Sequence, residues 1–361
     1  MPAFTRPPQL VMHDWPHQLE ALDKQLMELL NARCRLVGNA AGGIADPEQA
    51  LLESGELERL LTAGQGPLSA ERAKAIFREI QAAALELRQA PAVAYLGPSG
   101  TNTHQAALGR FGNTVHYLAR PTIPDVFEAV TRNQAAFGVV PVENSTEGAV
   151  TYTLDMFADS PVKISAEINM RIHNHLIGSG SRERLRVLYS HPQVFGQCRQ
   201  WLRRHLPAVP LVETFSTTEA AARAAAEDAA GAITGPLAAE QYRLPVMEAN
   251  IEDTAGNTTR FFVIGTRDTA PTGNDKTSIL FAIKDRVGAL LDSLEPFRRH
   301  GISLSFIESR PSRRKSWDYH FFVDFVGHAA EPKVQSMLHD LGEQCQSVKI
   351  LGSYPRAAAT T

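Results

Sequence analysis

The chain has few cysteines, no surplus of positive charge and no long apolar run. Its 361 residues include only three cysteines, Cys34, Cys198 and Cys345, which are far apart and odd in number. This spacing argues against a disulfide framework and against a metal site built on paired cysteines. The sequence therefore predicts a protein of a reducing compartment, and we expect it to be cytoplasmic.

The charge balance and the hydrophobic runs exclude two further classes of protein. The net charge is −3 at pH 7 and the pI is about 6.5, so there is no basic footprint for nucleic acid. No apolar run reaches the roughly 18 residues that a membrane helix requires. The amino terminus also lacks the apolar core of a secretory signal. We expect a protein without nucleic-acid or membrane partners, with a chain long enough for two or three domains.

Helical periodicity runs from the start of the chain to about residue 90. Leucines recur at three- and four-residue steps between residues 19 and 36, which is typical of an amphipathic helix. Further helices are predicted over 47–63 and from Ser69 onward. The Ala90-Pro91 step ends the pattern, because a residue before proline disfavours the α region. The sequence predicts an all-helical domain over residues 1–90.

Beyond this segment the pattern changes twice. Over residues 92–267 short apolar strands alternate with helices, which indicates α/β architecture, and the ligand of such a sheet usually lies beyond the carboxyl ends of the strands. Residues 268–276 form a turn-rich linker. Residues 277–355 follow the order strand, helix, strand, strand, helix, strand, which is the ferredoxin-like βαββαβ arrangement. The fold class is therefore a multidomain α, α/β and α+β protein.

Hydroxyl and amide side chains gather at the strand-to-helix junctions of the middle segment. A helix start with free N–H groups and a hydroxyl cap is a ready anion site, and several converging starts suit a ligand with more than one carboxylate. Each cluster taken alone is better explained as the cap of its own helix. The residues are Ser99, Thr101 and Asn102; Asn144, Ser145 and Thr146; Ser190 and His191; and Ser216 and Thr217.

Two histidines, His173 and His175, alternate on a predicted strand in a way that superficially suits a metal. No third ligand lies nearby in the sequence, so a structural role is predicted for both. We expect no metal site.

Five segments resemble, in order, the motifs of prephenate dehydratases. They are LGPSGTNTH (96–104), VPVENSTEGAV (140–150), YSHPQVFGQC (189–198), TFSTTEAA (214–221) and NTTRFFVI (257–264). The resemblance extends over nearly the whole chain to proteins that fuse a chorismate-mutase-like domain, a dehydratase domain and an ACT domain. It implies a two-lobed α/β dehydratase domain similar to type II periplasmic binding proteins. It also implies conversion of prephenate to phenylpyruvate, water and CO2 in L-phenylalanine biosynthesis, without a metal or an organic cofactor.

The same resemblance assigns roles to individual residues. Thr259 is expected nearest the leaving ring hydroxyl, with Arg260 beside it as a cation placed just before a strand that starts at Phe261. Glu143 and Asn144 are expected to shape the pocket or to donate to the substrate. The junction residues named above and Phe261 are expected to bind the substrate. A structural ion pair is the alternative for Arg260, and a surface position is the alternative for Glu143.

In the helical domain the resemblance to small chorismate mutases is incomplete. Arg33 falls on the apolar stripe of the first helix, where a cation of a mutase site is expected, with an ion pair inside the bundle as the alternative. Other positions where such mutases carry a cation have a different residue here. After Asp46-Pro47, for example, Gln49-Ala50 stands in place of the usual Arg-Glu pair. We expect weak or absent mutase activity and a domain kept for assembly. A bifunctional enzyme with a working mutase is the alternative.

Two segments of the last domain match the places where ACT domains of this type bind an amino acid between subunits. They are Gly288-Ala289-Leu290 at a helix start and Glu308-Ser309-Arg310-Pro311 at a strand end. Small residues let a ligand carboxylate approach free N–H groups, and Glu308 and Arg310 supply fixed charges. The alternative is that the second segment only connects a strand to a loop. The expected ligand is L-phenylalanine as a feedback inhibitor, which makes the protein at least a homodimer.

Other functions stay open at this point. A non-catalytic amino-acid sensor would use the same domains, but the intact Thr259-Arg260-Phe261 triplet favours the enzyme. A relative that prefers arogenate, or that decarboxylates prephenate without aromatising it, is poorly separated by sequence.

Overall fold

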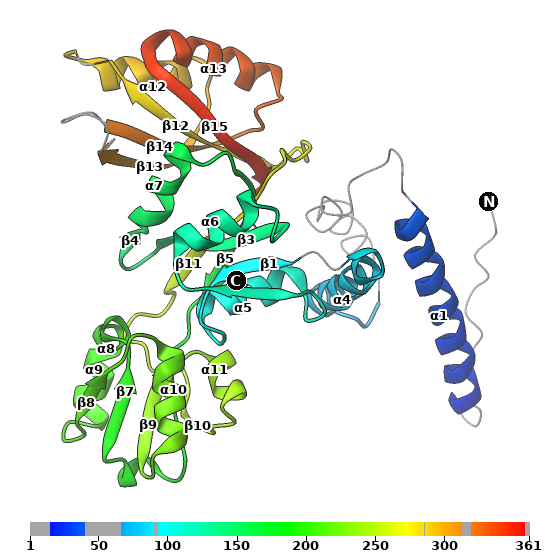
Figure 1. Ribbon diagram of the computed structural model, residues 1–361, viewed down its shortest axis with the longest axis vertical. Helices are drawn as coiled ribbons and strands as arrows, with labels where there is room; N and C mark the ends of the chain where they lie inside the picture. The colour runs from blue at the N-terminus through cyan, green and yellow to red at the C-terminus, as the bar shows by residue number, and fades with distance from the viewer. Residues whose placement is uncertain (1–14, 40–65, 90–91, 285, 312–318, 358–361) are drawn as a thin grey trace.

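The computed structural model describes residues 15–39, 66–89, 92–284, 286–311 and 319–357. Along the longest axis of the molecule, a C-terminal domain, a first α/β lobe and a second α/β lobe follow one another from top to bottom (Figure 1). A helical N-terminal region lies beside the first lobe. The described residues thus contain an α, an α/β and an α+β part, as expected.

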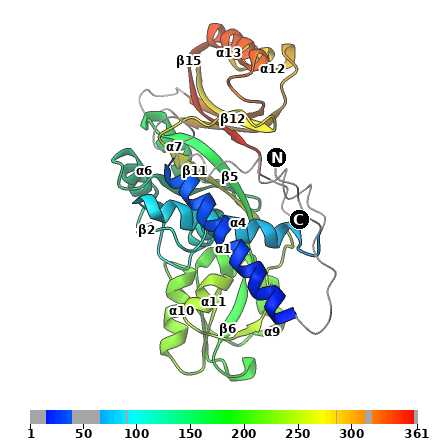
Figure 2. The same ribbon diagram turned by 90° about the vertical axis from the view of Figure 1, so that its right-hand side faces the viewer.

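The N-terminal region consists of two described helices, α1 (Trp15–Asn39) and α4 (Ala70–Gln89), which pack against each other. Figure 2 shows α1 crossing α4 on the outside of the molecule. The leucine stripe of α1 is exposed among the described residues, with Leu22 and Leu29 60% and 69% exposed. The helix predicted over 47–63 lies outside the described residues. No helix in the described part of the chain is both long and apolar enough to cross a membrane.

The first lobe is built on a mixed sheet in the order β2-β1-β3-β11-β5, with the short β4 paired to β3. Strand β11 returns from the second lobe and inserts antiparallel between β3 and β5. This antiparallel insertion brings the start of β11 beside the end of β3. The strands are β1 (Val93–Leu96), β2 (Tyr117–Arg120), β3 (Phe137–Asn144), β4 (Gly148–Ala149), β5 (Lys163–Arg171) and β11 (Thr258–Gly265). The helices are α5 (Asn102–Phe111), α6 (Ile123–Thr131) and α7 (Thr151–Asp159).

The second lobe has a sheet in the order β10-β6-β9-β7-β8, and the chain crosses between the lobes at 172–174 and 249–257. Two of its helices, α8 and α9, follow each other directly and are separated by Cys198. The strands are β6 (His175–Gly178), β7 (Val187–Ser190), β8 (Leu211–Glu213), β9 (Ala230–Thr234) and β10 (Val246–Glu248). The helices are η1 (Arg182–Arg184), α8 (Pro192–Gln197), α9 (Arg199–His205), α10 (Thr217–Ala226) and α11 (Pro236–Gln241).

The C-terminal domain has the predicted βαββαβ order, which is confirmed. Its sheet runs β13-β14-β12-β15, so β13 lies at an edge. Helices α12 and α13 cover the outer face of this sheet, and the first lobe lies on the other side (Figure 1). The elements are β12 (Asp275–Ile283), α12 (Ala289–Arg299), β13 (Leu304–Pro311), β14 (Tyr319–Val326), α13 (Pro332–Gln344) and β15 (Cys345–Pro355).

Strand β15 docks this domain onto the first lobe by close backbone contact. A Cβ atom added at Gly352 would lie 2.2 Å from the backbone oxygen of Ile164 in β5, so only glycine allows this approach. Nearby, Lys163 Nζ donates to the backbone oxygen of Ile350 at 3.1 Å. The docking is therefore set by main-chain atoms as well as by side chains.

The end of helix α7 is held from the C-terminal domain. The ammonium group of Lys349 in β15 donates to the backbone oxygens of Phe157 at 2.8 Å and Ser160 at 2.7 Å. The last carbonyls of a helix have no partner inside it, and a cation there also interacts favourably with the helix dipole. A residue of the C-terminal domain thus completes a helix of the first lobe.

Candidate active site

The ends of β3 and β11 carry the four residues predicted to be catalytic, in two pairs. In the register of the two strands, Thr259 lies opposite Asn144 and Arg260 lies opposite Glu143. Because successive side chains of a strand point to opposite faces, the two pairs lie on opposite faces of the sheet. The sequence interpretation started the strand at Phe261, whereas β11 starts at Thr258. The alternation therefore already separates Thr259 from Arg260.

Asn144 fixes the hydroxyl of Thr259 through a complete set of hydrogen bonds. Its Nδ2 donates to Thr259 Oγ1 at 2.8 Å and to Asn257 Oδ1 at 2.9 Å. Its Oδ1 accepts from the backbone N–H of Thr146 at 3.0 Å and from the Thr146 hydroxyl. These partners determine which way the amide points. Thr259 Oγ1 is therefore an acceptor toward Asn144, and its own hydrogen is available for a ligand.

Arg260 does not lie beside the Thr259 hydroxyl, and its expected position needs correction. Its Nε donates to Glu167 at 2.9 Å, its Nη1 is 2.6 Å from an Asp324 carboxylate oxygen, and its Nη2 donates to the Tyr354 hydroxyl at 3.0 Å. Burial alone would lower the pKa of Arg260, but the Tyr354, Asp324 and Glu167 oxygens raise it above its ordinary value. The structural ion pair, which was the alternative, is what the chain forms.

Glu143 accompanies Arg260 at the edge of this buried group. Its carboxylate lies 4.0 Å from Nη1 of Arg260, and its side chain is 37% exposed. Glu143 is thus on the face turned away from Asn144 and Thr259. Phe261, predicted to bind the substrate, is 1% exposed and packs in the core of the first lobe.

The two lobes touch each other next to the Asn144 hairpin. Glu147, in the turn between β3 and β4, accepts hydrogen bonds from the side-chain amides of Gln193 and, at 2.9 Å, Gln197 of α8. Asn174 in the crossing segment donates to the same Gln197 at 3.1 Å. The polar end of β3 therefore faces the second lobe, where a ligand could be held from both sides.

A second contact between the lobes lies at the first motif. Ser99 Oγ donates to Gln241 of α11 at 3.2 Å, and a Cβ added at Gly100 would lie 2.8 Å from the same amide oxygen. Gly100 has a φ of 86°, which glycine adopts without strain. The N–H of Gly100 donates to Nδ1 of His104 at 3.2 Å, and burial lowers the pKa of His104, which suits an accepting, neutral ring. This loop is thus preformed against the second lobe.

Most of the other predicted binding residues also serve their own helix or strand. Thr101, Ser216 and His191 cap α5, α10 and α8. Ser145 Oγ accepts from the N–H of Thr258 at 3.0 Å, and buried Ser190 donates to the oxygen of Ile233 at 2.8 Å. These hydrogen bonds place each residue at a helix start or strand end, and they neither include nor exclude a ligand.

Two further residues predicted to bind the substrate, Asn102 and Thr217, lie at the starts of helices. Asn102 begins α5, and its Oδ1 would lie 3.3 Å from a Cβ added at Gly235, at the start of α11 in the other lobe. Thr217 begins α10 and is partly exposed.

Three buried polar atoms at the starts and ends of these elements were not among the predicted binding residues, although Thr218 belongs to a hydroxyl cluster of the sequence. They are the hydroxyl oxygens of Thr218 and Thr234 and Nδ2 of Asn257, which have no hydrogen-bond partner in the described part of the chain. Unpaired buried polar atoms are uncommon in proteins and call for an explanation. The sequence marks two of these residues by their positions. Thr218 belongs to the TFSTTEAA segment, and Thr234 ends a buried strand before Gly-Pro.

The histidines behave as predicted for structural residues. His173 pairs with Glu252 at 2.9 Å, and His175 accepts from the N–H of Asn250 at 3.0 Å. They are not on one strand, because β5 ends at Arg171 and β6 starts at His175. Within the residues that the structure describes, no three His, Cys, Asp or Glu side chains are grouped as metal ligands would be. The three cysteines are free.

The predicted regulatory strand is also divided by alternation. Along β13, Ser309 and Pro311 are exposed, whereas Glu308 and Arg310 are partly buried. Arg310 pairs with Asp155 of α7 at 3.0 and 3.3 Å, so its charge is directed to the first lobe rather than to solvent. At the other segment, Gly288 caps α12 with a φ of 81°, Ala289 is buried and Leu290 is exposed.

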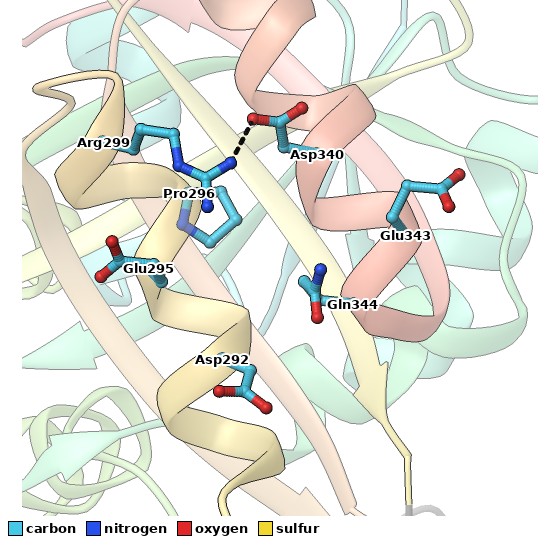
Figure 3. A pocket seen from close by; sticks show the side chains of 7 residues that line it. All are labelled: Asp292, Glu295, Pro296, Arg299, Asp340, Glu343 and Gln344. Atoms are coloured by element: carbon cyan, nitrogen blue, oxygen red, sulfur yellow. Dashed lines mark hydrogen bonds and ion pairs between the residues drawn. The ribbon is translucent and has the colours of Figure 1, made fainter.

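A hollow of about 470 Å³ lies between α12 and α13 (Figure 3). Four carboxylates line it, and Arg299 bridges to one of them, Asp340, at 3.2 Å. The sheet of the C-terminal domain separates this hollow from the first lobe (Figure 1). It is therefore not part of the site around Thr259. Its lining residues are Asp292, Glu295, Pro296, Arg299, Asp340, Glu343 and Gln344.

Comparison with known proteins gives consistent matches. A family model described as "Prephenate dehydratase" matches residues 93–269, and an "ACT domain" model matches 277–343. The curated "Bifunctional chorismate mutase/prephenate dehydratase" of Aquifex aeolicus is 45% identical over 351 residues, covering 94% of this chain and 96% of the relative. A solved prephenate dehydratase from Arthrobacter aurescens in complex with L-Phe has 32% identity and a TM-score of 0.68, over 73% of this chain and 90% of that one. A structure described as GqqA, a novel type of quorum quenching acylase, has 25% identity and a TM-score of 0.68, over 74% and 98%.

Proposed function

Because the chain belongs to the prephenate dehydratase family, in the form that joins a helical N-terminal region to dehydratase and ACT domains, we propose that it converts prephenate to phenylpyruvate, water and CO2. The observation that carries this proposal is the hydrogen bond from Asn144, at the end of β3, to Thr259, at the start of β11. It turns a hydroxyl group into a positioned donor at the junction of the two lobes.

The reaction needs little from the protein beyond orientation and one donor. As the ring carboxylate leaves as CO2, its electron pair completes the aromatic ring, and the ring hydroxyl departs and becomes water on gaining a proton. Thr259 donates a hydrogen bond to this departing oxygen, because its own oxygen is already occupied by Asn144. Positioned donors of this kind contribute typically about 10²- to 10⁴-fold to a rate.

The two carboxylates of prephenate are bound, in this proposal, by helix starts and buried hydroxyls rather than by Arg260. Helices α5 and α10 start beside the lobe contacts and have free N–H groups and a positive dipole end. The unpaired hydroxyls of Thr218 and Thr234 and the Asn257 amide offer further hydrogen-bond partners. In this proposal the ligand supplies the partners that these buried polar atoms lack among the described residues.

We propose in addition that the N-terminal region has weak or no mutase activity and serves assembly. On α1 the cations are Lys24, Arg33 and Arg35, and a guanidinium nitrogen of Arg33 is buried without a hydrogen-bond partner among the described residues. The exposed leucine stripe of α1 supports contact with a second copy of the chain, which makes the protein a homodimer or larger. Relatives named as bifunctional keep a working mutase as the alternative.

The purified chain is expected to form phenylpyruvate from prephenate without added metal and to leave chorismate almost unchanged. Phenylpyruvate is followed by its ultraviolet absorbance, with arogenate as a parallel substrate. Absence of phenylpyruvate would remove the dehydratase proposal. Rapid loss of chorismate would show instead that the mutase works, and a higher rate with arogenate would change the substrate.

The ACT domain supports a second part of the proposal, feedback inhibition by L-phenylalanine. The related Arthrobacter structure is described with L-Phe. In this chain Gly288 at the start of α12 and Ser309 and Pro311 of the edge strand β13 are exposed, so both segments are open to a ligand and to a second subunit. We place phenylalanine there, at a subunit interface, with its carboxylate at the α12 start.

Calorimetry is expected to show phenylalanine binding to the wild type and about 10-fold weaker binding to Ser309→Ala, the scale of one lost hydrogen bond. Phenylalanine should lower the dehydratase rate in parallel. Ser305→Ala, on the same face of β13, serves as the control and should bind like the wild type. No heat of binding and no change of rate at millimolar phenylalanine would contradict the regulatory proposal while leaving the catalytic one intact.

A further inference from the structure

A buried charge cluster joins the strand of Thr259 to the ACT sheet. We define the Arg260 cluster as Arg260 and Glu167 of the first lobe together with Lys276, Ser278, Asp324 and Tyr354 of the ACT domain. Asp324 and Tyr354 are 0% exposed, and Arg260 is 8% exposed. The cluster therefore lies inside the interface between two domains.

The cluster is balanced in charge and nearly complete in hydrogen bonds. Glu167 accepts from Arg260 at 2.9 Å and from Lys276 at 3.0 Å. Asp324 accepts from Ser278, whose oxygen also lies 2.6 Å from the Tyr354 hydroxyl. Every nitrogen of the Arg260 guanidinium has an oxygen partner within the cluster. This arrangement favours one geometry, because moving Arg260 away would leave the buried Asp324 carboxylate without its cation.

Stability alone is a weak reason for such an interface. A well-packed apolar contact holds two domains at least as firmly as buried ion pairs, which must first lose their water. What the charges add is a fixed position and direction. The guanidinium also lies over the ring of Phe262, 4.8 Å from its centroid, so the side chain is held from its face as well as from its edge.

The cluster is one residue from the proposed donor. Thr259 and Arg260 are consecutive in β11, and both pair regularly with Asn144 and Glu143; the irregularity in the ladder comes only after Arg260. An anchor on the Arg260 side chain therefore fixes the backbone that presents the Thr259 hydroxyl on the opposite face. A displacement of about 1 Å at such a group costs on the order of 100-fold in rate.

We propose that Arg260, Asp324 and Tyr354 are positioning residues of the dehydration reaction, through which the ACT sheet holds the Thr259 hydroxyl in place. This inference rests on the proposed dehydratase function. It assigns to Asp324 and Tyr354, two residues of the ACT domain outside its two predicted regulatory segments, an effect on the chemical step through Arg260.

The test is a double-mutant cycle in the full-length protein. Asp324→Asn keeps the shape of the side chain and removes its charge, and it should lower kcat roughly 10- to 100-fold with KM changed less than about 3-fold. In a Thr259→Ala background the same substitution should have almost no further effect, because the hydroxyl that it positions is gone. Rates are divided by the folded fraction from circular dichroism, so that loss of folded protein does not count as loss of positioning.

Two further variants make the result decisive. Asp275→Asn changes another buried carboxylate of the same domain, which among the described residues accepts hydrogen bonds from Thr272 and Gly273, and it should leave kcat unchanged. Tyr354→Phe removes one hydroxyl from Arg260 and gives the same cycle if Asp324→Asn does not fold. An unchanged kcat in the folded variant, or an equal loss with and without Thr259, would overturn the inference. Failure of the wild type to make phenylpyruvate would instead overturn the proposed function.

Discussion

Replacing Thr259 by alanine is expected to lower the rate of phenylpyruvate formation by about 100-fold or more, which is the scale of a lost positioned donor. The side chain removed is small and partly exposed, and Asn144 keeps its hydrogen bond to Asn257, so the fold should persist. KM should change little, because the hydroxyl acts on the departing oxygen rather than on the carboxylates. Steady-state kinetics with prephenate measures both constants.

The neighbouring residue provides the control for this prediction. Thr258 carries the same side chain one position earlier, and its hydroxyl donates to the backbone oxygen of Gly256 at 3.1 Å. Thr258→Ala should therefore stay within about 3-fold of the wild-type rate, since exposed polar contacts are worth little. Full activity of Thr259→Ala would exclude Thr259 from the mechanism, and an equal loss in both variants would point to the strand end as a whole.

Gly352→Ala is expected to destabilise the docking of the ACT domain by about 3 kcal/mol, at the upper end of the usual cost of overpacking. The added methyl would meet the backbone of β5 at 2.2 Å, where no side-chain end can move aside, so β15 and β5 must separate. The midpoint of the first thermal transition should fall, and the dehydratase rate should fall with it if the Arg260 cluster opens.

Gly342→Ala is the matched substitution. This glycine lies in α13, and an added Cβ would meet no atom within 4 Å. Since alanine favours a helix by about 1 kcal/mol over glycine, its midpoint should stay the same or rise. A Gly352→Ala protein that unfolds at the wild-type temperature would show that the close backbone contact does not hold the two domains.

Sequence motifs predicted which residues meet but not which way they point. Asn144 and Thr259, 115 positions apart, were both taken from family-like segments and are in direct contact. Arg260 was taken from the same segment and faces the other domain. The directions of the Thr259 and Arg260 side chains depend on where β11 begins and on which domain covers each face of the sheet. The eight residues of the strand determine neither of these.

In the predicted regulatory strand β13, too, the sequence did not show which way neighbouring side chains point. Ser309 and Arg310 are adjacent, yet one is exposed and the other pairs with Asp155 of the first lobe. The βαββαβ order was predictable because each apolar segment has the length and period of its element. The contact between α7 and β13 was not, because it joins elements from different domains whose relative position no local pattern specifies.

Helix α7 belongs to the first lobe but is also held by two residues of the ACT domain. Its carboxyl end is closed by Lys349 and its middle is held by Arg310, while its first turn follows directly on the Asn144 hairpin. The free energy needed to expose its amides therefore includes the cost of detaching the ACT sheet, and the two should open as one cooperative unit. A domain boundary defined by sequence position therefore separates residues that should unfold together.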